Sequence, residues 1–163
     1  MIVGTAATDL GWESHVFDLM DAGPSLGATL GRRNAPPEID RIWTAIETCD
    51  ALVVGSPVYK ASYTGLLKHL FDMVDANALR GRPVLVSATA KTPSYELMID
   101  HQFRPLFAFF RAIVVPGTVY TLDQDFGPEN EPTEAPVDLL NHPSFIWKVP
   151  MMNRPAGGNG SGR

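Results

Sequence analysis

Residues 51–75 read ALVVGSPVYKASYTGLLKHLFDMVD, and this stretch decides the fold. Its first residues are apolar without alternation and stop at a glycine and a proline, which is typical of a short strand buried on both faces of a sheet. From Leu66 to Val74 the apolar residues repeat with a period of about 3.6, which predicts an amphipathic helix. The stretch therefore predicts a strand, a loop rich in small and hydroxyl residues, and a helix.

Strands and helices alternate on both sides of this stretch. Apolar residues at helical spacing predict a helix over residues 37–50. A second apolar strand is expected in RGRPVLVSAT (residues 80–89) and a third in IVVPGTVYTL (residues 113–122), while residues 13–20 are a further strand candidate. Strands that alternate with helices imply crossover connections, so the sequence predicts a parallel sheet covered by helices on both faces.

A third helix is expected over residues 94–112. Thr92 and Pro93 precede it and suit the N-cap and the first helical position. Pro105 lies inside this stretch. Because proline removes a backbone hydrogen bond, we expect Pro105 to bend or break the helix.

Composition narrows the classes of function. A chain of 163 residues suits one domain with a real core, and a net charge of -5 argues against non-specific DNA binding. No apolar run approaches the length of a membrane span, and one cysteine cannot form an internal disulfide, so we expect a reducing cytoplasm. That cysteine, Cys49, lies on the apolar side of a predicted helix, which favours a packed thiol over a reactive one.

Two loops follow the carboxyl ends of predicted strands, where open α/β sheets bind their ligands. They are residues 56–65 (SPVYKASYTG) and residues 88–95 (ATAKTPSY). Small residues let backbone N–H groups approach a flat ligand, and Tyr59 offers a ring for a wall. The alternative is that Tyr59 and Tyr63 only cover the end of the sheet and that Lys60 is a solvated charge.

Other motifs do not compete with these loops. The sequence has no dinucleotide-binding glycine motif, no Walker loop and no paired Cys and His at metal-ligand spacing. A nucleophile elbow is also missing, and the histidines are scattered along the chain at His15, His69, His101 and His142. The sequence therefore predicts neither a catalytic side chain nor a metal site.

Residues 55–89 resemble the NADPH-dependent FMN reductases, and within them the alkanesulfonate type, which supplies reduced flavin to two-component monooxygenases. The segments PVYKASYTG, LLKHLFD and GRPVL occur in the family's order, and MIDHQFRPLFAFFRAIVVPGTVY extends the resemblance to residues 18–127. The resemblance implies a flavodoxin-like α/β/α fold with three layers. It also implies an NAD(P)H:FMN oxidoreductase that passes hydride from NADPH to FMN, with a monooxygenase as partner.

The resemblance further implies that the flavin ring lies against the two loops, with NADPH stacked on its exposed face. The cofactor carries the redox chemistry, which agrees with the missing catalytic side chain. The implied cofactor-binding residues are Ser56, Pro57, Val58, Tyr59, Lys60, Ala61, Ala88, Thr89, Ala90, Lys91 and Thr92.

Alkanesulfonate-type members carry an extra residue in the third helix, which forms a π-bulge at the subunit interface. The position that matches it here is His101. The resemblance therefore implies a homodimer or homotetramer, with His101 tuning assembly or flavin exchange. The alternative is a helical histidine that faces a neighbouring subunit and plays no part in turnover.

The sequence departs from the family's pattern in three places: near its start, in one rim loop, and after residue 127, where the family's terminal helix is not expected. Nothing in residues 1–23 supplies the Ser-x-Arg-x-x-Ser loop that holds the flavin phosphate, so we expect residues 14–21 to form the family's second strand. The first strand and first helix, roughly twenty residues, are then absent. In the alternative, MIVG is the first strand and TAATDLG an anion loop. The family's Thr-Gly-Gly is here Thr89-Ala90-Lys91.

We expect the reductase domain over residues 1–127. Residues 128–163 are proline-rich and then glycine-rich, which predicts an irregular extension that is flexible after about residue 150. Two alternatives to the FMN reductase stay open. One is a quinone, azo-dye or chromate reductase on the same flavoprotein scaffold, and the other is a flavodoxin-like carrier or inactive remnant.

Overall fold

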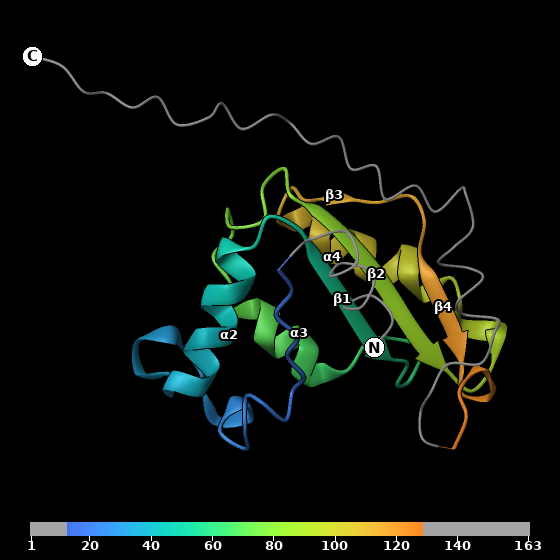
Figure 1. Ribbon diagram of the computed structural model, residues 1–163, viewed down its shortest axis with the longest axis horizontal. Helices are drawn as coiled ribbons and strands as arrows, with labels where there is room; N and C mark the ends of the chain where they lie inside the picture. Colours follow the sequence, from blue (N-terminus) through green and yellow to red (C-terminus); the bar gives the residue numbers. More distant parts are fainter. Residues whose placement is uncertain (1–12, 129–163) are drawn as a thin grey trace, which may run out of the picture.

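The computed structural model of the chain describes residues 13–128 (Figure 1). A parallel sheet packs against three α-helices in this part of the chain. In chain order the helices and strands are α2 (Pro37–Thr48), β1 (Leu52–Pro57), α3 (Gly65–Asp72), β2 (Pro83–Ala90), α4 (Arg104–Phe109), β3 (Ile113–Val114) and β4 (Val119–Leu122). The predictions of helices near residues 37–50 and 66–74 are confirmed.

Strand β2 is the centre of the sheet. Strand β1 pairs with one side of it, and β3 and β4 pair with the other, all in parallel. The third predicted strand is therefore two short strands, because Val115 to Thr118 stand opposite only Leu85 and Val86 of β2. Pro116 in this interruption has no backbone N–H to give to a ladder.

The helices cover one face of the sheet. The strand residues of the hydrophobic core all point to this face: Val54, Val84, Val86 and Ala88. Helices α2, α3 and α4 bring buried side chains to the same core, among them Trp43, Phe71 and Phe107. On the other face of β1, Val53 is 41% exposed, so the expectation that this strand is buried on both faces is wrong for residues 13–128.

The core includes a cluster of phenylalanine rings. Phe71 of α3 meets Phe107 of α4 edge to face at 5.2 Å, and Phe103 stacks on Phe107 at 6.3 Å. Such pairs add to the burial of apolar area. They fix α3 against α4 under the sheet.

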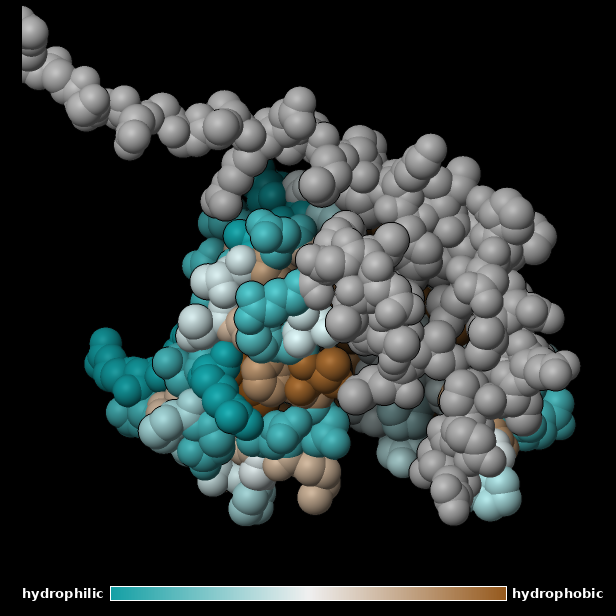
Figure 2. Space-filling model, viewed as in Figure 1, coloured by the Kyte–Doolittle hydropathy of each residue, from teal (hydrophilic) through white to brown (hydrophobic). Residues whose placement is uncertain are grey.

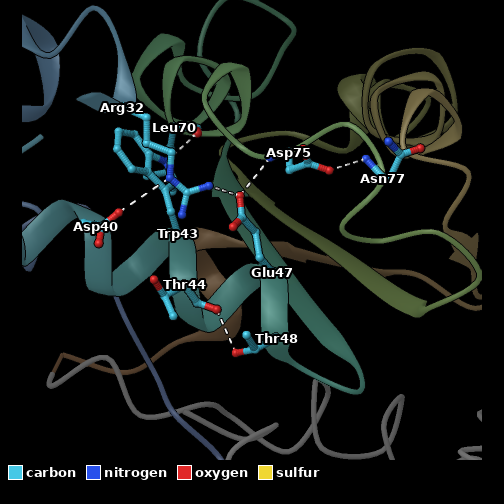
Figure 3. A network of polar contacts seen from close by, with 9 residues as sticks. All are labelled: Arg32, Asp40, Trp43, Thr44, Glu47, Thr48, Leu70, Asp75 and Asn77. Carbon is cyan, nitrogen blue, oxygen red and sulfur yellow. Dashed lines mark hydrogen bonds and ion pairs between the residues drawn. The ribbon is translucent and has the colours of Figure 1, made fainter. Parts of the chain in front are cut away.

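Polar contacts join the segment before α2 to this helix and to the turn after α3 (Figure 3). Arg32 bonds Glu47 and lies 3.5 Å from a carboxylate oxygen of Asp40, and Glu47 also accepts the amide of Asp75 at 2.8 Å. Buried Trp43 donates its indole N–H to the carbonyl of Leu70 at 2.9 Å. The network holds α2 in register with α3.

Residues 13–20 do not form the predicted strand. Residues 13–18 have no secondary structure, and turns follow them, in which the Asp18 carboxylate accepts the amides of Met20 and Asp21. A strand needs a neighbour for its backbone groups, whereas an aspartate can satisfy nearby amides by itself. The alternative that placed the first strand in MIVG falls on residues outside the described part of the chain.

Cys49 is a packed thiol, as predicted. It ends helix α2, packs against the core and donates to the carbonyl of Ile46 at 3.1 Å. Burial raises the pKa of the Cys49 thiol, so the reactive thiolate is disfavoured.

The surface around helices α2 and α3 is mostly hydrophilic, with one small hydrophobic area within it (Figure 2). This agrees with the amphipathic character of both helices. Within residues 13–128, no helix combines the length and the apolar character that a membrane crossing needs.

Candidate functional site

The two predicted loops leave the sheet side by side. Pro57 at the end of β1 pairs with Thr89 near the end of β2, and the amide of Val58 donates to the carbonyl of Thr89 at 2.8 Å. Because parallel strands end at the same edge, both loops belong to one rim. The prediction that the two loops converge is confirmed.

The first loop contains a tight turn from Tyr59 to Ser62. The two residues exchange backbone hydrogen bonds of 2.8 and 3.2 Å, and Lys60 and Ala61 between them have φ of 52° and 64°. Positive φ at both central positions is the conformation that glycine and asparagine usually supply. Residues with a Cβ in this region are often strained, and such strain gathers at functional sites.

This turn presents an aromatic ring and free backbone donors. Tyr59 is 64% exposed, and Lys60 and Ala61 are exposed beside it. Among residues 13–128, the amides of Lys60 and Ala61 have no hydrogen-bond partner. The turn therefore offers a wall and two N–H donors to a ligand at the rim.

The base of the first loop is closed by hydroxyl groups. The buried Ser56 hydroxyl donates to the carbonyl of Pro57 at 2.9 Å and accepts the amide of Thr64 at 3.1 Å. The Thr64 side chain then caps α3 by accepting the amide of Leu67 at 3.2 Å. Ser56 is therefore occupied in shaping the loop.

The second loop is held by β4. The hydroxyl groups of Thr89 and Thr121 lie 3.0 Å apart, and the Tyr120 hydroxyl donates to the carbonyl of Thr92 at 2.7 Å. Burial raises the pKa of Tyr120. Sequence reasoning missed Thr121 and Tyr120. They could have been selected because the third predicted strand, residues 113–122, is parallel to the others and should end at the same rim.

The remaining predicted residues differ in what they can offer. Ala88 and Ala90 are buried, the methyl group of Ala88 belongs to the hydrophobic core, and the Ala88 carbonyl accepts the Thr121 hydroxyl at 3.3 Å, so Ala88 is engaged within the fold. Lys91 is exposed, and the Thr92 hydroxyl accepts the amide of Ser94 at 3.3 Å. The structure thus brings all the predicted cofactor-binding residues to one rim, and their roles toward a ligand stay predictions.

A π-helical turn, Ile99–Phe103, and the short helix α4 lie where the sequence predicts one bent or broken helix over residues 94–112. His101 lies in it and is exposed, which agrees with the expected position of the π-bulge. Helix α4 begins directly after this turn, so Pro105 falls in its first turn, where a missing N–H is harmless. The helix is thus broken before Pro105.

Gln102, the neighbour of His101, touches the first loop. The Ser62 hydroxyl donates to the side-chain oxygen of Gln102 at 3.3 Å, and the ring of Tyr63 lies 5.2 Å from that of Phe103. Sequence reasoning did not select Gln102 or Ser62. His101 makes no described contact with the loop, and its role in assembly or flavin exchange stays a prediction.

The geometry suits a flat ligand with polar edges. Two loops with small side chains, exposed N–H donors and one aromatic ring meet at the rim, and residues 13–128 contain no group of three His, Cys, Asp or Glu that could hold a metal ion. A planar heterocycle such as a flavin ring fits this set of donors, because the ring edge needs hydrogen bonds and its faces need apolar contact.

Comparisons with known proteins agree with the resemblance. The family model described as NADPH-dependent FMN reductase matches residues 1–127. An FMN reductase (NADPH) of Pseudomonas aeruginosa is 48% identical over 130 residues, which are 78% of this chain and 70% of that protein. The NADH-dependent FMN reductase SfnF of Pseudomonas putida is 51% identical over 141 residues, 84% of this chain and 76% of that protein.

A solved structure supports the same assignment. The X-ray structure of an oxidoreductase from Corynebacterium diphtheriae is 37% identical and matches with a TM-score of 0.66, covering 78% of this chain and 71% of that one. The expected flavodoxin-like fold is therefore confirmed, with the sheet and one helical layer in residues 13–128. By sequence and by fold, this chain belongs to the NADPH-dependent FMN reductase family.

Proposed function

We propose that this chain is an NAD(P)H-dependent FMN reductase that supplies reduced flavin to a partner monooxygenase. The observation that carries the proposal is the hydrogen bond from Val58 to Thr89, since it places both predicted flavin loops at one rim. Membership of the reductase family supports the reaction. The resemblance of residues 55–89 to reductases of two-component systems supports the partner.

The residues at the rim bind and orient the flavin. Tyr59 forms a wall against the ring, and the amides of Lys60 and Ala61 donate to its polar edge. The hydroxyl of Thr89 bonds that of Thr121 and so fixes the position of the second loop at the rim. Bound FMN supplies the hydride chemistry, so the protein needs no acid, base or nucleophile of its own.

NADPH and NADH are both candidate donors. The relative from Pseudomonas aeruginosa is named for NADPH and the one from Pseudomonas putida for NADH. The exposed lysines Lys60 and Lys91 can attract either dinucleotide to the rim. We therefore propose NAD(P)H as the donor.

We also propose that the chain works in the cytoplasm as a homodimer or homotetramer, assembled through the π-helical turn. Leu97 and Phe109, before and after this turn in the chain, are 64% and 67% exposed, and an interface at the turn would remove such apolar surface from water. Light scattering on the purified chain tests the assembly, and a monomer at working concentration would contradict it.

The test of the reaction is a direct assay. The purified chain is mixed with FMN and either NADPH or NADH, and the loss of nicotinamide absorbance is followed, with a reaction without FMN as the control. We expect oxidation that requires FMN. If the folded chain oxidises neither donor in the presence of FMN, the proposal is wrong.

The behaviour of FMN separates the proposal from its alternative. Release of FMN in each turnover, with transfer to an added monooxygenase, is expected of a flavin supplier. Retention of FMN together with rapid reduction of a quinone, azo dye or chromate would favour the other reductase class. Tight FMN binding without any response to either donor would favour a carrier.

A further inference from the structure

The Tyr59–Ser62 turn is held in an unfavourable conformation by few contacts. Lys60 and Ala61 have positive φ, and neither has the freedom of a glycine. Such a conformation persists only where its surroundings determine it. The contacts that hold this turn therefore control where its exposed ring and amides lie.

Two of these contacts come from the π-helical turn. The hydroxyl of half-buried Ser62 donates to the side chain of half-buried Gln102 at 3.3 Å, and the ring of Tyr63 packs on that of Phe103 at 5.2 Å. Within residues 13–128, the Ser62–Gln102 bond is the one side-chain hydrogen bond from residues 59–62 to another element. Gln102 is thus the polar tether of the turn.

The π-helical turn is a rigid base for this tether. Ile99 and Phe103 are 2% and 0% exposed, and Asp100 pairs with Arg104 at 2.6 Å. The Arg104 guanidinium also donates to the carbonyl of Pro116 at 3.0 Å, in the interruption of the last strand. The position of Gln102 is therefore fixed by the core below it and by the sheet behind it.

We infer that Gln102 is a positioning residue for flavin binding. Its side chain holds Ser62, and through the turn it sets the place of the Tyr59 ring and of the amides at positions 60 and 61. This inference rests on the proposed function, because it assumes that the turn binds FMN. Loss of the tether lowers FMN affinity about two- to tenfold, the effect of one net hydrogen bond.

The test uses side chains that keep or remove the acceptor. Gln102→Met keeps the length and loses the hydrogen bond, Gln102→Glu still accepts from Ser62, and Ser62→Ala removes the donor. We expect Gln102→Met and Ser62→Ala to raise the Kd of FMN, measured by flavin fluorescence, and the KM for FMN more than they change kcat. Gln102→Glu should restore most of the affinity, and the double variant should be no weaker than either single one.

A readout without flavin tests the turn itself. Trypsin can cut after exposed Lys60 in the turn, and exposed Arg80 in another loop is an internal reference. We expect Gln102→Met to accelerate cleavage at Lys60 relative to Arg80. Thr48→Ala is the matched control for Ser62→Ala, because the Thr48 hydroxyl bonds the Thr44 carbonyl within α2 and has no contact with the rim.

The outcomes separate the inference from the proposed function. Absence of FMN use by the unaltered chain is a failure of the proposed function, seen before any variant is made. With FMN use established, unchanged FMN affinity in Gln102→Met or strictly additive effects with Ser62→Ala overturn the inference. Unchanged cleavage at Lys60 overturns it as well.

Discussion

The backbone of Val58 donates a hydrogen bond to Thr89, one residue beyond the last pair of strands β1 and β2. The ladder between the strands therefore continues into the loops. Because the loops are joined where they leave the sheet, the distance between their first residues is set by backbone geometry. Side chains further along each loop then decide what the rim binds.

Replacement of Tyr59 should impair flavin use more than replacement of Lys91. Tyr59 is 64% exposed at the rim and can stack on the ring, whereas Lys91 is an exposed charge in water. We expect Tyr59→Ala to raise the KM for FMN about two- to tenfold and Lys91→Ala to change it less than about twofold. Steady-state kinetics with FMN as the varied substrate measures both, and equal effects would contradict the ranking.

Gly55→Ala should destabilise the sheet through one side chain. A Cβ at Gly55 would lie 2.8 Å from the hydroxyl oxygen of Ser87 on β2. The Ser87 hydroxyl must then turn away from the Val54 carbonyl, which costs about 0.5–1.5 kcal/mol of unfolding free energy. Urea unfolding of Gly55→Ala, Ser87→Ala and the double variant checks the cause, because Gly55→Ala should cost little more once Ser87 is alanine. A cost of Gly55→Ala that persists in the Ser87→Ala background would point to the backbone instead.

Arg111→Gly should stabilise the fold. Arg111 has φ of 56° just after the C-cap residue of α4, and the amides of Arg111 and Ala112 donate to the carbonyls of Ala108 and Phe107, which is the helix end that usually carries glycine. Relief of the left-handed backbone is worth about 1 kcal/mol. Thermal unfolding measures it. Arg80→Gly is the matched control, since Arg80 is also exposed but has no positive φ, and a gain of the same size there would refute the explanation.

The stability of the second loop should fall at alkaline pH. Burial raises the pKa of Tyr120 above 10.0, so in the unfolded chain this phenol loses its proton first. The neutral phenol therefore contributes fully to the free energy of unfolding below pH about 10. This contribution is lost as the pH rises through the pKa that Tyr120 has in the folded chain. Urea unfolding at pH about 8 and about 11 measures the difference. In Tyr120→Phe this difference should be smaller, and an equal decline in both proteins would contradict the role of Tyr120.

Elements whose stability comes from local pattern could be predicted from the sequence. The spacing of Ile39, Ile42 and Ile46 requires a helix that buries one side, and α2 is that helix. The apolar run that ends at Gly55 and Ser56 gives β1, and the convergence of the two loops follows from parallel pairing. Local chemistry and one topological rule are sufficient for this part of the site.

Features that depend on a distant partner could not be predicted. Residues 13–20 have a strand-like composition but form no described ladder. The contacts of Thr121 and Tyr120 depend on a shift of register, because four residues from Val115 to Thr118 stand opposite two of β2. The π-helical turn brings Gln102 to Ser62, which is 40 residues away in the sequence. No periodicity in the sequence predicts this contact.

Because the last strand is divided, one side of β2 has two separate hydrogen-bonded ladders. Ile113 and Val114 pair with the amino end of β2, while Val119 to Leu122 pair with its carboxyl end, from which the second loop leaves. Short hydrogen-bonded units can open one at a time. Because β3 pairs two residues with β2 and β4 pairs four, the β3 end of this edge should open before the rim, and the amide protons of β3 should exchange with solvent before those of β4.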